Sequence, residues 1–289
     1  MKRFTASVVA KPAVDTLLDG HVFGVVRGAG DSTAYIDAAG VVLAITGRDV
    51  PAMPNGISVT QRDGLREFES GSKVEFGPEG ISGEDASVSL RGSRIWNPRI
   101  GQWRNPEELR AIGEGIWRSL SLAGADDPKG MIDSLTRAGY ESASGDDGRA
   151  GLEALFRSLA DRDAEYVRRA AELLIGRGPG LTPEGDDFLA AAAATVYACE
   201  PVMARRADLD AWRSPVLPAD LRERTTALSA TLLELAVQGF VSEPVQRLFE
   251  GESSSGDWVD ALGRLVKVGH GTGRAWAAGC AAAAKLLTR

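Results

Sequence analysis

The spacing of apolar residues changes abruptly at Trp96-Asn97-Pro98, and this change constrains the fold more than any other feature of the chain. Before it, apolar residues come in short runs of period two separated by Gly, Asp and Pro, which is typical of β-strands. Strands are predicted at about 22–26, 33–36, 41–45, 57–60, 74–76 and 88–90. Ala38-Ala39-Gly40 suits a hairpin loop with Gly40 in the left-handed position. The pattern predicts a small antiparallel barrel or sandwich.

After Pro98 the apolar residues recur with helical spacing, and no convincing strand pattern follows. Asn105 and Pro106 are favourable N-cap and first-turn residues for a helix over 106–122. Further helices are predicted at about 149–160, 163–176, 183–199, 219–239, 243–250, 257–268 and 272–287. We therefore expect an α+β fold, with a β-rich, barrel- or sandwich-like domain at residues 1–98 and an all-helical domain at residues 99–289.

Composition excludes several classes of function. The 289 residues carry 40 acidic and 33 basic side chains, a formal net charge of −7, whereas nucleic-acid binding depends mainly on Lys and Arg. Cys199 and Cys280 stand alone in apolar helical patterns, which favours a reducing compartment. The N-terminus lacks a signal-peptide pattern, and the longest apolar run, 188–199, is too short to span a bilayer. We expect a cytoplasmic protein that binds neither nucleic acid nor membrane.

Residues 176–188, GRGPGLTPEGDDF, contain more special residues than a turn requires. Thr182, Pro183 and Glu184 suit a helix start as cap, first helical residue and charge at the positive helix end. Capping does not account for the glycines at 176, 178 and 180, nor for Gly185, where glycine costs about 1 kcal/mol relative to alanine. Such glycines can direct backbone N–H groups at an anion. The segment is therefore either a ligand site or an elaborate helix cap.

The two adjacent aspartates are expected to differ in role. Asp186 follows Thr182 by four residues and is predicted to project from the same helix face, whereas Asp187 is rotated about 100° further round. A carboxylate beside an anion site makes chemical sense if it binds a cation or a substrate N–H. We expect one aspartate to face the ligand and the other to be structural or solvated.

A second turn repeats this arrangement at 268–274, VGHGTGR. Gly269 can end the preceding helix and Thr272 can cap the next one. His270, one of two histidines with His21, is either structural or an acid–base group exposed by the flanking glycines. Both turns lead into helices rich in Ala and Gly, which can approach closely. If these helices pack in parallel, their N-termini converge at one place.

A third element is the predicted helix at 219–239, on which Thr226 and Ser229 fall on one face. Their hydroxyls either face a ligand or bond back to helix carbonyls. Other motifs are absent from the sequence: there is no nucleophile elbow, zinc-ligand spacing, Walker A loop or Rossmann turn. The Gly-Asp-Asp-Gly at 145–148 lacks the remaining ligands of a calcium loop.

The segment 178–189, GPGLTPEGDDFL, resembles the signature of a bacterial family named for the AllH-type subunit of oxamate carbamoyltransferase. Supporting pieces stand in the family's order: Thr226-x-x-Ser229, Ala236-x-x-Gly239 and Gly269-His270-x-x-Gly273. Gly271-Thr272 and Arg274 depart from the residues usual in the family. The resemblance covers about 170–280 and, more loosely, the β-rich part.

The resemblance implies a subunit of an enzyme that moves a carbamoyl group between oxamate and phosphate in allantoin breakdown, working with other chains. His270 and Asp186 are the candidate catalytic residues. The candidate substrate-binding residues are Gly178, Gly180, Thr182, Gly185, Asp187, Thr226, Ser229, Gly269, Gly271, Thr272, Gly273 and Arg274. The expected partners are a small anionic metabolite and other enzyme subunits. No cofactor is expected; the alternative is a Mg²⁺ ion bound at Asp186. The alternatives are a non-catalytic anion-binding or scaffold protein, and a metal-dependent hydrolase using Asp186 and Asp187.

Overall fold

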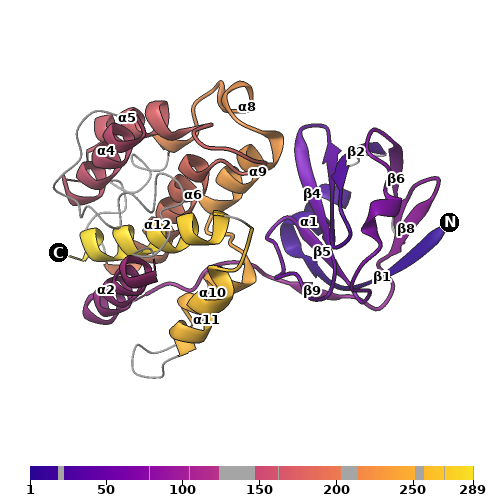
Figure 1. Ribbon diagram of the computed structural model, residues 1–289, viewed down its shortest axis with the longest axis horizontal. Helices are drawn as coiled ribbons and strands as arrows, with labels where there is room; N and C mark the ends of the chain where they lie inside the picture. The colour runs from indigo at the N-terminus through magenta and orange to yellow at the C-terminus, as the bar shows by residue number, and fades with distance from the viewer. Residues whose placement is uncertain are drawn as a thin grey trace. The chain divides into compact units, whose positions relative to one another are not determined.

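The computed structural model describes residues 1–18, 23–77, 79–103, 105–123, 147–161, 163–202, 214–250, 257–269 and 271–288. The predictions for His21, His270 and most of the 141–149 loop lie outside these residues. Contacts divide the chain into two compact units, Met1–Pro98 with Val241–Glu243, and Arg99–Phe240 with Pro244–Arg289. The first is β-rich and the second helical, which confirms the predicted α+β class (Figure 1).

The described part of the first unit forms one nine-stranded sheet. Its strands are β1 (Lys2–Ala10), β2 (Phe23–Ala29), β3 (Thr33–Ala38), β4 (Val41–Thr46), β5 (Gly56–Val59), β6 (Lys73–Gly77), β7 (Gly80–Ser82), β8 (Ala86–Ser89) and β9 (Arg94–Trp96). Antiparallel pairing of β1 with β5 closes eight strands into a barrel, and β9 adds alongside the end of β1. Helix α1 (Lys11–Leu18) follows β1, and a 3₁₀ turn, η1 (Leu65–Glu67), follows β5.

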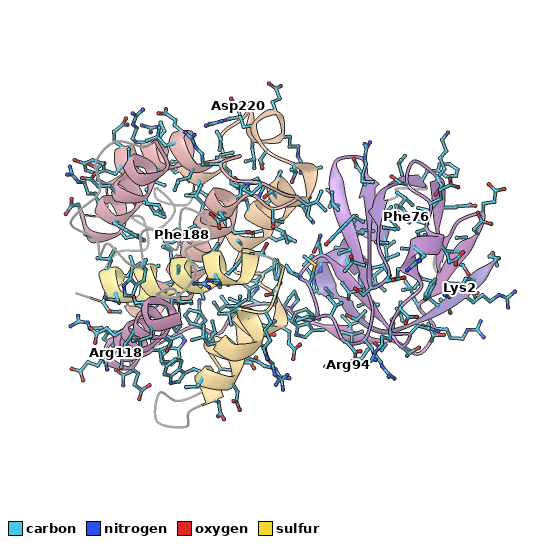
Figure 2. All side chains as sticks on the ribbon, viewed as in Figure 1. Lys2, Phe76, Arg94, Arg118, Phe188 and Asp220 are labelled. Carbon is cyan, nitrogen blue, oxygen red and sulfur yellow. The ribbon has the colours of Figure 1, made fainter. Side chains whose placement is uncertain are left out.

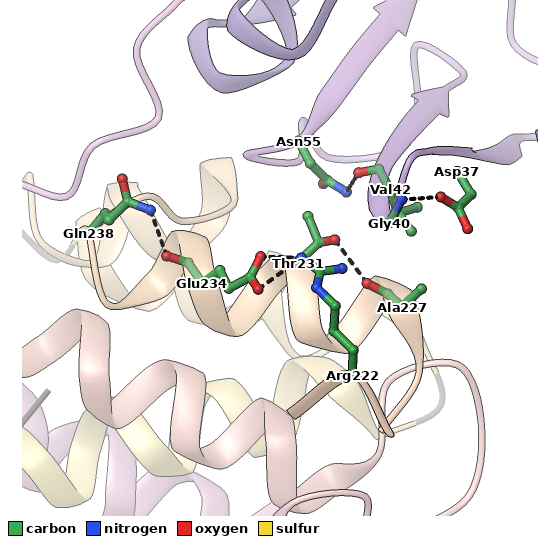
Figure 3. Close-up of polar contacts among 9 residues, drawn as sticks. All are labelled: Asp37, Gly40, Val42, Asn55, Arg222, Ala227, Thr231, Glu234 and Gln238. Atoms are coloured by element: carbon green, nitrogen blue, oxygen red, sulfur yellow. Dashed lines mark hydrogen bonds and ion pairs between the residues drawn. The ribbon is translucent and has the colours of Figure 1, made fainter. Parts of the chain in front are cut away.

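Alternation of side chains builds the barrel core. In β3 every second residue is buried, and Phe76 of β6 belongs to the same cluster (Figure 2). Phe4 and Phe68 stack in this core with ring centroids 5.9 Å apart. The hairpin loop between β3 and β4 has Gly40 at φ 94°, as predicted, and the Gly40 N–H donates to Asp37 Oδ1 at 2.7 Å (Figure 3).

The described helices of the second unit are α2 (Pro106–Ala123), α4 (Asp147–Asp161), α5 (Ala164–Leu174), α6 (Glu184–Ala198), α8 (Leu221–Arg224), α9 (Ala227–Ala236), α10 (Glu243–Leu248), α11 (Asp257–Leu265) and α12 (Thr272–Leu287). The 3₁₀ turns η2 (Glu200–Val202) and η3 (Ser214–Val216) complete the set. The prediction of a single helix at 219–239 is wrong. Thr225 is extended at φ −140°, and the Thr226 side chain caps a new helix.

The centre of this unit is the packing of α6 on α12, and α12 also contacts α2 and α4. Phe188 is buried on α6 among these helices (Figure 2). A Cβ on Gly279 of α12 would lie 2.6 Å from the Phe188 carbonyl oxygen, so only glycine permits this approach. The contacts Thr182–Thr272, Asp187–Trp276 and Ala191–Cys280 join residues whose sequence numbers differ by 90, 89 and 89. This nearly constant difference shows that the helices run parallel. The predicted convergence of their N-termini is therefore confirmed.

The structure also bears on the two cysteines and on whether a helix could cross a membrane. Cys199 and Cys280 are buried, and burial raises the pKa of both thiols, so neither is placed as a nucleophile. Within the described ranges, no helix combines the length and the apolar character needed to cross a bilayer.

Candidate functional site

The glycine-rich loop between α5 and α6 contains three glycines with positive φ: Gly176 (75°), Gly178 (116°) and Gly180 (95°). A Cβ at Gly176 would overlap the carbonyl oxygen of Arg224, and one at Gly178 would lie 2.8 Å from the Glu184 nitrogen. Gly180 faces open space. The first two glycines are thus required by close packing, whereas Gly180 is required only by its backbone conformation.

Asp186 ties this loop to the break between α8 and α9. The carboxylate is 1% exposed; Oδ1 accepts the Gly176 N–H at 2.8 Å and Oδ2 accepts the Thr225 hydroxyl. Burial raises the pKa of Asp186, and the Thr225, Gly176 and Ser229 hydrogen bonds and the Arg224 charge oppose that rise. Asp186 therefore holds three segments of the chain together.

The predicted common face for Asp186 and Thr182 is wrong. Helix α6 begins at Glu184 with Pro183 as its N-cap, so Thr182 lies before the helix and the four-residue spacing has no helical meaning. Thr182 and Thr272 were also predicted to be caps, but neither Pro183 nor Gly271, the observed N-caps, makes a side-chain capping bond. Both threonines are thereby left for other contacts.

The glycines inside the two first turns allow close helix packing. A Cβ on Gly185 would overlap the Leu174 carbonyl oxygen at the end of α5, and one on Gly273 would overlap the Leu265 carbonyl oxygen at the end of α11. Each Ala-rich helix thus starts against the C-terminal turn of another helix. These glycines shape the site without needing to contact a ligand.

The two glycine-rich turns meet through Thr182 and Thr272, whose hydroxyl oxygens lie 2.8 Å apart. Gly271 lies beside Glu184 of the opposite turn, since a Cβ there would lie 3.0 Å from Glu184 Oε1. We call the side chains of Thr182, Thr272, Asp187 and Trp276 the turn junction. It contains residues that are 90 positions apart in the sequence.

Asp187 lies at the base of the turn junction and is 2% exposed. Its Oδ1 accepts the Trp276 indole N–H at 3.2 Å, whereas Oδ2 has no hydrogen-bond partner among the described residues. Burial raises the pKa of Asp187 well above its ordinary value; Thr182, Trp276 and Thr272 oppose that rise, and the Asp186 charge adds to it. One aspartate was expected to be either structural or solvated; both are buried, so the solvated alternative is wrong.

Thr226 and Ser229 also reach this region. The Thr226 hydroxyl donates to the Leu181 carbonyl oxygen at 2.6 Å and accepts the Ser229 N–H at 3.1 Å, so it links α9 to the glycine-rich loop. The other predicted possibility for Thr226, a hydroxyl that donates back to a helix carbonyl, is found at Thr231, which donates to Ala227 O at 2.8 Å (Figure 3). Sequence reasoning missed Thr225, although two adjacent threonines inside a predicted helix are a signal of a helix break.

Sequence reasoning also missed Arg224. Its guanidinium donates to the Glu172 carbonyl oxygen at 2.7 Å, which fixes the end of α5 beside the glycine-rich loop. Arg222 lies on the same short helix and pairs with Glu234 of α9 (Figure 3). The basic pair thus anchors α8 to its neighbours on both sides.

The exposed rim of the site is the loop at 177–181. Within the described structure, the amides of Gly178 and Gly180 make no hydrogen bond to the chain. Arg177 is exposed in the same loop, and Arg274 of α12 is half-buried with its Nε and Nη2 atoms covered. Amides and guanidinium groups near two helix N-termini favour an anion.

A metal site finds no support in the described side chains. They contain no cluster of three or more His, Cys, Asp or Glu residues that could hold an ion. Both carboxylate oxygens of Asp186 already accept hydrogen bonds. A Mg²⁺ ion at Asp186 would have to bind a carboxylate oxygen that already accepts one hydrogen bond.

Residues 174–284 match the family model for the oxamate carbamoyltransferase subunit AllH. The matched segment contains the glycine-rich loop, both aspartates, the Thr225-Thr226 break and the 269–274 turn. The predicted resemblance to that family is confirmed over these residues. No curated protein and no solved structure matches the chain.

The raised pKa of Asp187 predicts a characteristic pH dependence of stability. The folded state binds the proton more tightly than the unfolded state, so the free energy of unfolding falls as pH rises above the ordinary carboxyl range. Asp187→Asn should remove this part of the decline. Urea unfolding, monitored by the circular dichroism of the helices at several pH values, measures this decline. Asp260→Asn, on the exposed face of α11, is the control. An equal decline in wild type and Asp187→Asn would contradict the prediction.

Proposed function

We propose that this chain is a subunit of a carbamoyltransferase-type enzyme that acts on a small anionic substrate of the oxamate and carbamoyl phosphate class. The match of residues 174–284 to a carbamoyltransferase subunit family supports the reaction type. A subunit implies partner chains, and we propose a hetero-oligomer whose other subunits complete the catalytic site. Allantoin breakdown in the cytoplasm is the proposed setting.

The observation that carries this proposal is the direct contact between the two turns at Thr182 and Thr272. Two parallel helices begin there, so their positive ends point at one place. Carbamoyl transfer to or from phosphate requires donors for phosphate oxygens and for the oxygen that gains charge in the transition state. The rim amides of Gly178 and Gly180, together with Arg177 and Arg274, are proposed to supply them.

Asp186 and His270 are assigned different roles in this proposal. Both oxygens of Asp186 accept hydrogen bonds from the chain, so we propose that it positions the loop rather than touching substrate. His270 is proposed as the acid or base toward the transferred carbamoyl nitrogen, because it stands in the turn beside Thr272 in the sequence. Metal is not needed for either role.

The contacts of Asp186 also favour a second candidate function, a non-catalytic anion-binding or scaffold subunit. A carboxylate that only secures three chain segments is equally useful to a protein whose loop docks on a catalytic partner. In that case the chain binds the anion, but substitutions at His270 leave the activity of the assembled enzyme unchanged.

Ligand-dependent thermal unfolding tests the site directly. Phosphate, oxamate or carbamoyl phosphate at ten times its dissociation constant should stabilise the chain by about 1.4 kcal/mol. We expect this shift without Mg²⁺, loss of the shift in Thr272→Val, and its retention in Thr195→Val. The Thr195 hydroxyl donates to Ala191 O within α6 and lies beside Cys280, outside the turn junction. Stabilisation that requires Mg²⁺ would instead support a metal-dependent hydrolase.

Activity needs the assembled enzyme. Carbamoyl transfer between oxamate and phosphate should appear when the chain is combined with subunits encoded beside its gene, and His270→Asn should reduce it by at least about a hundredfold. Transfer unaffected by His270→Asn would support the scaffold function. Absence of transfer in every combination would refute the carbamoyltransferase assignment.

A further inference from the structure

We propose that Asp187, Thr182 and Thr272 form a chain of hydrogen bonds in which Asp187 is the neutral acid, so that the outermost threonine hydroxyl donates to an oxygen of the bound anion. This inference rests on the proposed function and adds the group that recognises the anion. The ligand class is a small oxyanion, namely phosphate, sulfate or the carboxylate of oxamate.

The geometry places the members of this chain together and leaves Asp187 Oδ2 without another partner among the described residues. The Thr182 and Thr272 hydroxyls are 2.8 Å apart, and both are close enough to the Asp187 carboxyl to influence its charge. Asp187 Oδ1 is occupied by the Trp276 N–H, which leaves Oδ2 as the oxygen that can carry a proton toward the hydroxyls. Asp187 is buried, but both threonines are partly exposed. The threonines can therefore contact a ligand that Asp187 cannot reach.

The charge on Asp187 fixes the direction of every hydrogen bond in the chain. A hydroxyl has one proton to donate. If Asp187 is ionised, it accepts a proton from one threonine, that threonine accepts from the other, and the outer oxygen offers only a lone pair. If Asp187 is neutral, it donates, the first threonine donates to the second, and the outer hydroxyl donates outward. Only the neutral form presents a donor to an anion.

The surrounding charges favour the neutral form. Glu184 and Asp186 precede Asp187 in the first turn of α6, and Asp186 raises the pKa of Asp187 further. Among the described residues, the cations of this region are Arg177 in the glycine-rich loop, Arg274 on α12 and Arg224 at the end of α8, and Arg224 acts on Asp186. No ion pair among the described residues includes Asp187. A neutral acid also removes the repulsion that a buried carboxylate would exert on an anion at the same helix ends.

The experiment is calorimetric titration with sulfate from about pH 5 to about pH 9, because sulfate keeps its charge throughout this range whereas phosphate does not. Wild-type affinity should fall at least about tenfold as pH rises, since deprotonation of Asp187 reverses the chain. In Asp187→Asn the amide N–H₂ donates at every pH, so we expect strong binding with no such fall. Thr182→Val and Thr272→Val should each weaken binding at low pH, and Thr195→Val should not.

A histidine side chain ordinarily titrates in this pH range, and His270 stands in the second turn of the sequence, so the series is repeated with His270→Asn present. The pH dependence should survive in that background and disappear only when Asp187 is replaced. Two results would overturn the inference: an unchanged pH profile in Asp187→Asn, or no sulfate binding to the wild type at any pH. Carbamoyl transfer by the assembled enzyme is measured in parallel. Transfer without this pH effect refutes the inference alone, and anion binding without transfer refutes the proposed function alone.

Discussion

Replacing Gly185 by alanine is expected to destabilise the helical unit by at least about 3 kcal/mol, the upper end of what overpacking costs. The new methyl group would overlap the Leu174 carbonyl oxygen, which is backbone at the end of α5 and cannot rotate away. Relief would require α6 to move away from α5, which would also pull Asp186 from the Gly176 amide. For a unit of this size the melting temperature should fall by roughly 6–12 °C.

Gly263 provides the matched control for this substitution. It also lies inside a helix, α11, but a Cβ there meets nothing within 4 Å. Gly263→Ala should therefore leave stability unchanged or raise it by up to about 1 kcal/mol through better helix propensity. Thermal unfolding of both variants decides the matter. Similar melting temperatures for Gly185→Ala and wild type would show that α5 and α6 are not in close backbone contact.

These two glycines illustrate why the fold was predictable in outline only. Period-two and helical spacing report which side of an element is buried, and they predicted most strands, the helix at 272–287 and the change at Pro98. They cannot report that β1 pairs with β5, β8 and β9, because pairing depends on distant partners. Nor can a sequence distinguish Gly185, packed on Leu174, from Gly180, which faces open space.

Prediction of the candidate site reached the right segments but not the right contacts. The repeated glycine-to-threonine pattern indicated that the two turns converge, and the structure joins them at Thr182 and Thr272. The phase of the aspartates was wrong because it assumed that α6 starts at Thr182 and not at Glu184. Thr182 lies before the helix, so its spacing from Asp186 does not determine which aspartate faces it. The contacts with Trp276, Thr182 and Thr272 show that Asp187 is the aspartate at the turn junction.

Replacing Asp186 by alanine is expected to lower stability by about 3–6 kcal/mol and to abolish anion binding by the glycine-rich loop. The variant removes the acceptor of the Gly176 and Thr225 hydrogen bonds, each worth about 1.5–3 kcal/mol to a buried charged group. It leaves the Gly176 N–H and the Thr225 hydroxyl without their acceptor, so the loop loses its connection to the α8–α9 break. Urea unfolding and sulfate titration at a temperature where the variant remains folded measure the two effects separately.

The amide variant distinguishes positioning from a requirement for charge. In Asp186→Asn the remaining oxygen can still accept the Gly176 N–H, and the new N–H₂ can donate to the Thr225 oxygen, while no charge is buried. If Asp186 positions the loop, Asp186→Asn should keep most of the stability and of the anion affinity, and Thr225→Val should show about half the loss of the alanine variant. If carbamoyl transfer instead disappears in a fully stable Asp186→Asn enzyme, the carboxylate itself takes part in the reaction. Asp186 would then have to leave its present hydrogen bonds during turnover, which the contacts to Gly176 and Thr225 oppose.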